Sequence, residues 1–120
     1  MIHGYAFCFK VWFEGELDDK GWVIDFGCFK RNGVKEWMKN MFDHTTCVAG
    51  DDPELDLFEE MDRRGIIDLR VLEDGVGCEK FAQYVAQYLQ KIVDKETQGR
   101  AKVYKVQCWE HEDNMAEYYV

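Results

Sequence analysis

Aspartate and histidine stand side by side at positions 43 and 44, in the stretch MFDHTT, where a helical pattern ends. Such a pair can move protons in an active site, and this chain has only three histidines. The same residue types also finish helices, because they hydrogen-bond free backbone groups and a histidine suits the negative end of the helix dipole. From Asp43 and His44 alone, we favour the structural interpretation.

Three further residues could do chemistry. Cys78 follows Gly77 at the start of a predicted helix, where the helix dipole lowers a thiol pKa, so it could act as a nucleophile or base. A small buried packing residue is an equally good interpretation of Cys78. Glu79 could simply complement the helix dipole. Glu110 continues an apolar row on a predicted strand, so its carboxylate either emerges into solvent, which we favour for a single position, or binds a ligand in a pocket.

The elements that must position these residues follow from hydrophobic periodicity. Alternation over residues 5–13 predicts a strand, and a turn at 18–21 leads into a short return strand at 22–26. Helical spacing predicts a helix over 34–42. The core-facing residues of the strand and the helix are, respectively, Tyr5, Phe7, Phe9, Val11, Phe13 and Val34, Trp37, Met38, Met41, Phe42.

Sequence patterns in the second half of the chain predict five more elements. A short helix has Asp52 as N-cap, Pro53 at its first position and Gly65 as its stop. Residues 66–72 alternate and predict a strand or an extended segment, and residues 77–93 form the clearest helix. Strands at 100–111 and 115–120 are joined by a turn at Asp113-Asn114. The row facing the helices on the first of these strands is Tyr104, Val106, Cys108 and Glu110. Strands that bracket helices indicate the α+β class, with an antiparallel sheet covered on one side.

Composition bounds the class of protein. A chain of 120 residues, 47% of them hydrophobic, suits a single globular domain over residues 1–120. Fifteen basic and 24 acidic residues give a net charge of −9, which argues against nucleic acid and anionic membranes as partners. No apolar run approaches the ~20 residues that span a bilayer. The five cysteines contain no C-x-x-C pair, which argues against a disulfide framework and favours a reducing cytoplasm.

Taken in order, several short motifs resemble one family. They are the histidine-glycine pair at 3–4, GELDDKGWVIDFG at 15–27, DHTT at 43–46, GCEKFAQYVAQYL at 77–89 and YKVQCWEHEDNMAEYY at 104–119. Their order and spacing are similar to the 6-pyruvoyl-tetrahydropterin synthase family, and more closely to its bacterial 6-carboxytetrahydropterin synthase branch. The resemblance implies the tunnelling fold: a four-stranded antiparallel sheet with two long helices on one face. Subunits of that family join their sheets into barrel rings, as trimers or hexamers with active sites at subunit interfaces.

The resemblance also implies chemistry. Family members act on 7,8-dihydroneopterin triphosphate, in pterin or queuosine-type deazapurine synthesis, with zinc held by three histidines. In that frame Asp43 and His44 match the proton-relay pair, and Glu110 matches the carboxylate that anchors the pterin ring. Cys78 and Glu79 match the segment beside the pterin, and His3 matches the first histidine of the family's H-G-H motif. These matches change our interpretation of Asp43 and His44 towards catalysis.

Departures from the family pattern support a second hypothesis. The H-G-H motif reads His3-Gly4-Tyr5, so a phenol replaces one zinc ligand. The family strand that carries another zinc histidine and the catalytic cysteine has no counterpart before Met1. Cys78 could substitute as a base, and the three histidines His3, His44 and His111 could converge. The alternative is a non-catalytic relative that binds a pterin or purine-like molecule without a zinc site.

Overall fold

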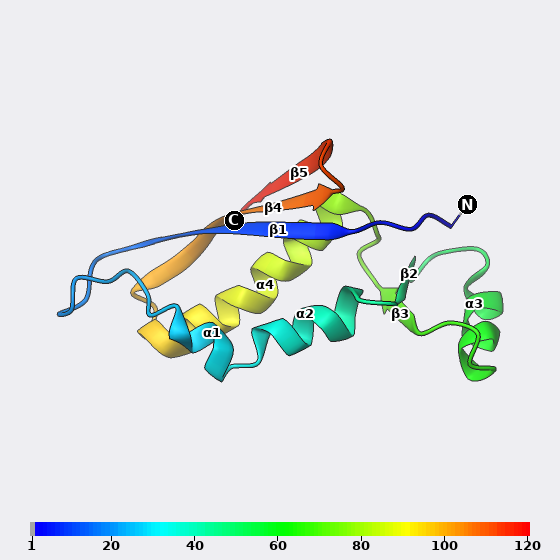
Figure 1. The fold of residues 1–120 in the computed structure, drawn as a ribbon, viewed down its shortest axis with the longest axis horizontal. Coiled ribbons are helices and arrows are strands. Elements are labelled where there is room, and N and C mark those ends of the chain that lie inside the picture. Colours follow the sequence, from blue (N-terminus) through cyan, green and yellow to red (C-terminus); the bar gives the residue numbers. More distant parts are fainter. Residues whose placement is uncertain (1) are drawn as a thin grey trace.

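A three-stranded antiparallel sheet forms one layer of the molecule. The computed structural model describes residues 2–120, and its sheet has the strand order β1-β4-β5, with β1 at Phe7–Gly15, β4 at Ala101–Glu110 and β5 at Asn114–Tyr119. Alternation places Phe7, Phe9, Val11 and Phe13 against the core, as the sequence predicts. The strands β1 and β5 are the two edges of this sheet (Figure 1).

The long helix α4, Cys78–Thr97, covers one face of this sheet. Its buried residues recur at helical spacing and include the predicted Phe81, Val85, Leu89 and Ile92. They pack against buried residues of β4, among which Val103, Val106 and Cys108 have no exposed surface. The helix is four residues longer than predicted at its C-terminal end, where Thr97 donates a hydrogen bond from Oγ1 to the Val93 carbonyl (2.7 Å).

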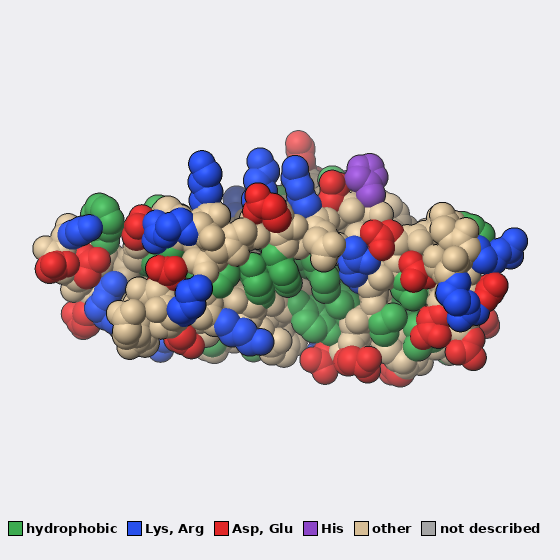
Figure 2. Space-filling model, turned by 90° about the horizontal axis from the view of Figure 1, so that it is seen from below, with side chains coloured by type: hydrophobic (Ala, Val, Ile, Leu, Met, Phe, Trp, Pro, Cys, Tyr) green, Lys and Arg blue, Asp and Glu red, His purple; other side chains and the backbone are tan. Residues whose placement is uncertain are grey.

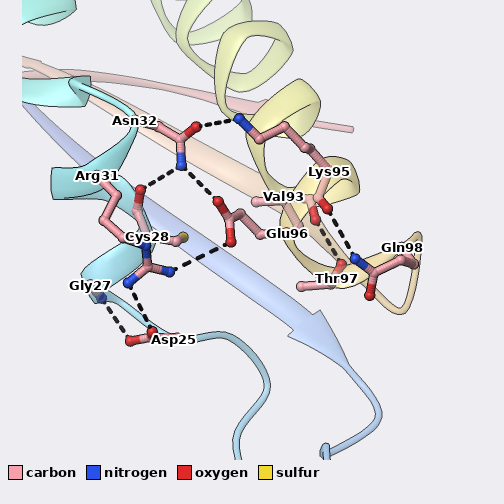
Figure 3. A network of polar contacts seen from close by, with 10 residues as sticks. All are labelled: Asp25, Gly27, Cys28, Arg31, Asn32, Val93, Lys95, Glu96, Thr97 and Gln98. Carbon is pink, nitrogen blue, oxygen red and sulfur yellow. Dashed lines mark hydrogen bonds and ion pairs between the residues drawn. The ribbon is translucent and has the colours of Figure 1, made fainter.

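Two shorter helices lie beside α4 (Figure 1). The helix α2, Val34–Phe42, carries the predicted apolar face, and its Trp37 ring stacks on Tyr88 of α4 at 3.8 Å between centroids. The helix α1, Gly27–Arg31, was not predicted. It is tied to α4 by Asn32, whose side-chain amide donates to the Cys28 carbonyl (2.7 Å) and to Glu96 (2.9 Å) (Figure 3).

A separate small lobe lies between α2 and α4 in the chain. It consists of β2, Thr46–Ala49, α3, Leu55–Arg63, and β3, Leu69–Leu72, with the two strands paired in parallel. The strand β2 was not predicted. The N-cap of α3 is Glu54 rather than Asp52, whose carboxylate instead accepts the Glu54 N–H (2.8 Å). Gly65, at φ 73°, follows the helix as the predicted stop.

The structure corrects the expected sheet in two respects. Residues 22–26 form no strand, so within residues 2–120 the antiparallel sheet has three strands rather than four. Only one of the described helices that cover it is long. The register between β1 and β4 shifts between Trp12 and Phe13, so Val103 faces the core where alternation predicted Tyr104. No helix in the described part of the chain is long and apolar enough to cross a membrane.

Candidate functional site

Three of the predicted site residues meet where α4 begins and β4 ends. Cys78 is the first residue of α4, Glu79 follows it, and Glu110 is the last residue of β4. Glu110 pairs with Phe7 across the sheet, and Phe7 contacts Phe81 of α4 with 5.1 Å between ring centroids. Glu110 is half-buried and lies close enough to Cys78 to influence its thiol, whereas Glu79 is exposed. The fold therefore brings two carboxylates to the first turn of one helix.

The thiol at this point does not have the electrostatics that its position in the sequence suggested. Burial is the main reason that the pKa of Cys78 is raised to about 11. Glu110 and Glu79 contribute to this rise, and the hydrogen bond with Cys108 opposes it. The helix dipole alone predicts a lowered pKa for this thiol. Burial and two neighbouring carboxylates outweigh the dipole, so at neutral pH Cys78 is a protonated thiol and a poor base.

Asp43 and His44 lie just beyond the C-terminal end of α2, and both are exposed. His44 Nε2 is 3.7 Å from Asp43 Oδ1, and the His44 side chain is 93% exposed. His44 adopts φ 56°, the left-handed region that histidine tolerates better than most residues. Thr45 Oγ1, not Asp43 or His44, donates to the Met41 carbonyl that the helix leaves free (2.8 Å). Asp43 is nevertheless the C-cap residue of α2, because its backbone N–H donates to the Lys39 carbonyl (2.9 Å). This role leaves the Asp43 and His44 side chains open to solvent.

The residues implied for zinc do not fit a three-histidine site within residues 2–120. His3 is exposed and its ring stacks on Tyr5, with 5.9 Å between centroids. Tyr5 in turn contacts His111 at 5.4 Å, so two of the three histidines approach one tyrosine. No group of three or more His, Cys, Asp or Glu side chains among the described residues could hold a metal ion. We therefore assign no step to zinc.

Apolar space lies at the other end of the sheet. A groove of about 540 Å³ is bordered by Phe13 of β1 and by Trp22 and Ile24 of the loop that joins β1 to α1. Phe13 pairs with Val103, at the opposite end of the β1–β4 ladder from Glu110. The carboxylates and this groove therefore belong to two separate regions of one chain.

Two features of these regions are not predicted by the sequence pattern. Cys108 was predicted only as a core residue, yet its sulfur lies 3.5 Å from the Cys78 sulfur. The groove was missed because residues 22–26 were interpreted as a strand. The available signal for an exposed apolar loop was the stretch of large apolar residues that follows Gly21, in which Trp22 and Phe26 are aromatic.

Comparison with known proteins identifies the family of the chain. The family model described as 6-pyruvoyl tetrahydropterin synthase matches residues 1–120, the whole chain. The chain belongs to this family. No curated protein sequence matches it. Because the family match spans the whole chain, the carboxylates at the start of α4 and the aspartate–histidine pair lie within a synthase-family fold.

Solved structures show the same fold. An uncharacterized protein from Wolinella succinogenes is 20% identical with a TM-score of 0.74, over 98% of this chain and 78% of the other. The 6-pyruvoyltetrahydropterin synthase of Plasmodium vivax, solved as a catalytic-residue mutant, is 17% identical with a TM-score of 0.71, over 100% and 82%. The Plasmodium falciparum synthase is 19% identical with a TM-score of 0.67, over 100% and 83%. At these identities the likeness concerns the fold.

Proposed function

We propose that this synthase-family chain binds the bicyclic ring of a pterin of the 7,8-dihydroneopterin triphosphate class, with Glu110 as the ring anchor. The observation that carries the proposal is the convergence of Glu110 and Glu79 at the first turn of α4. A carboxylate can accept two parallel hydrogen bonds from the amino group and ring N–H of a pterin or purine. Glu110 is half-buried, so such bonds form partly shielded from water and are strengthened.

A complete pocket in this proposal requires a second copy of the chain. The carboxylate end of the sheet supplies ring recognition, whereas the apolar groove at Phe13 and Trp22 supplies a stacking surface at the opposite end. Joining the sheets of neighbouring copies brings the ends of different subunits together. This arrangement follows the family's active sites at subunit interfaces, as trimers or hexamers.

The test replaces one carboxylate oxygen of Glu110 with an amide NH2 group. Glu110→Gln preserves the shape of the side chain but replaces one acceptor with a donor, so we expect affinity for neopterin or biopterin to fall by ~2 kcal/mol, which is well over tenfold. Isothermal titration calorimetry measures this change. Glu112→Gln is the matched control, because Glu112 is an exposed carboxylate two positions away. Equal affinity of the wild type and Glu110→Gln would remove Glu110 from the site.

For catalysis, we propose that Asp43 and His44 act as the proton relay. Their contact at 3.7 Å and their exposure suit a proton relay that acts on a ligand bound at an interface with another copy. If the chain is a catalytic synthase, it should convert dihydroneopterin triphosphate. His44→Ala should then abolish conversion while pterin binding persists. A non-catalytic relative binds the pterin with no product in either variant. Product analysis by chromatography separates these two outcomes.

A further inference from the structure

Two buried thiols lie in contact between the start of α4 and the end of β4. The Sγ atoms of Cys78 and Cys108 are 3.5 Å apart, although the residues are 30 positions apart in the chain. Cys78 is 7% exposed and Cys108 has no exposed surface. All five cysteines are free, so this contact is between two reduced thiols.

We propose that Cys78 and Cys108 are a reversible modification site, which low-molecular-weight disulfides such as oxidised glutathione convert into an intramolecular disulfide. The bond pins the first turn of α4 to β4, directly beside Glu79 and Glu110. This inference rests on the positions of the two sulfurs and is independent of the ligand proposed above.

The geometry needs only a small movement. A disulfide joins its sulfurs at about 2.05 Å, so the present separation of 3.5 Å must close by about 1.5 Å. Cys78 lies at the N-terminal end of α4, after Gly77 at φ 120°, a conformation that glycine adopts without strain. The end of a helix beside a glycine can shift more easily than its middle. Cys108 is fixed in the middle sheet strand, so the movement belongs to Cys78.

Exposure sets the order of the two exchange steps. The Cys78 thiolate attacks one sulfur of the small disulfide, forms a mixed disulfide and releases one small thiolate. The Cys108 thiolate then attacks the Cys78 sulfur, forms the Cys78–Cys108 bond and releases the second small thiolate. The two protons lost by the cysteines go to the two released thiolates. The small disulfide is thereby reduced and the protein dithiol oxidised, each by two electrons.

The surroundings make this exchange slow at neutral pH. Burial raises the pKa of Cys78 to about 11 and raises that of Cys108 as well. The charged groups that face the pair are Glu79 and Glu110, and both disfavour a thiolate. Because only the thiolate attacks, we expect the oxidation rate to increase as pH rises from 7 to 10.

Peptide mapping provides the test. The full chain is incubated with oxidised glutathione at pH 8, unfolded, alkylated and digested with trypsin. The proposal predicts that peptides 71–80 and 106–120 are recovered as one crosslinked species, separated by dithiothreitol. The melting temperature of the oxidised protein should be higher by on the order of 10 °C, because the bond closes a loop of about 30 residues in the unfolded chain.

Matched variants assign the effect. Cys78→Ser and Cys108→Ser should each lose the crosslink and the thermal shift, whereas Cys8→Ser, which removes an exposed cysteine, should keep both. If Cys108→Ser fails to fold, Cys78→Ser and the wild-type map still decide the question. The proposal is overturned if both peptides are recovered alkylated while glutathione is found only on Cys8. A crosslink with an unchanged melting temperature would overturn the pinning of α4.

Discussion

Asn32 shows how much one residue can contribute to this fold. Its amide nitrogen donates to the Cys28 carbonyl and to Glu96, and its oxygen accepts from Lys95 Nζ (2.8 Å) (Figure 3). The side chain thus finishes α1 and joins it to the last turns of α4. We expect Asn32→Ala to lower the free energy of unfolding by about 2 kcal/mol, because partly buried partners lose their hydrogen bonds.

Urea unfolding followed by circular dichroism measures this loss. Asn40→Ala is the control, since Asn40 is exposed and its side chain makes one marginal contact with Arg70 (3.3 Å). The control should change stability by less than about 0.5 kcal/mol. Equal stabilities of the two variants would show that the network in Figure 3 contributes little.

His3 carries a second prediction at the scale of one residue. It is exposed beside Tyr5, and the described residues offer no group of three ligands. A phenol near neutral pH is a poor zinc ligand, because it holds its proton. We expect this 120-residue chain, purified without added metal, to contain well below one zinc per subunit. We also expect His3→Ala to leave the zinc content unchanged.

Elemental analysis per subunit decides this prediction. Stoichiometric zinc that is lost in His3→Ala would mean that His3 coordinates metal in a site assembled between copies. Such a result would also strengthen the case for turnover, because a bound zinc ion can act as a Lewis acid.

At the scale of elements, α2 is held to the core by partly buried apolar side chains and by aromatic contacts. It has no fully buried residue, yet it follows a clear helical pattern and its Trp37 stacks on Tyr88 of α4 at 3.8 Å. Trp37 also contacts Phe42 edge-on. We expect Trp37→Ala to destabilise the chain by about 2 kcal/mol, through lost apolar area and stacking. The loss should be visible as a lower midpoint of urea unfolding.

Trp22→Ala serves as the matched control for Trp37→Ala. Trp22 is 45% exposed and lies on the loop between β1 and α1, where its ring contacts Lys20 Nζ at 5.3 Å. Trp22→Ala should therefore lower the free energy of unfolding much less than Trp37→Ala. A cost as large as that of Trp37→Ala would contradict the view that α2 is held by its stack on α4.

The whole molecule leaves apolar surface and strand edges uncovered. Figure 2 shows hydrophobic side chains gathered in the middle of the face on which α2 lies, and the apolar residues of α2 are only partly buried. Both edges of the three-stranded sheet, β1 and β5, are unpaired in the described chain. Exposed edges invite pairing with another copy. We expect a trimer or a multiple of it, as in the family's rings.

Light scattering on the purified protein measures the mass directly. A clean monomer at micromolar concentration would contradict ring closure and the shared pocket together. It would leave the Cys78–Cys108 disulfide untouched, because both sulfurs belong to one chain.

Local patterns determined much of this protein. Periodicity identified β1, the two helices α2 and α4, and the two C-terminal strands, because alternation and helical spacing record which face of an element is buried. The sequence motifs also identified the family, which the match over residues 1–120 confirms. These features depend on residues close together in the chain.

Only the tertiary structure decided which distant residues meet. The missing strand at 22–26, the parallel pair β2–β3 and the register shift at Trp12 depend on pairing partners far along the chain. The raised pKa of Cys78 likewise depends on the burial that packing imposes and on Glu110, about 30 positions away. A sequence pattern cannot show these effects, because long-range register and desolvation arise only when the sheet and α4 pack together.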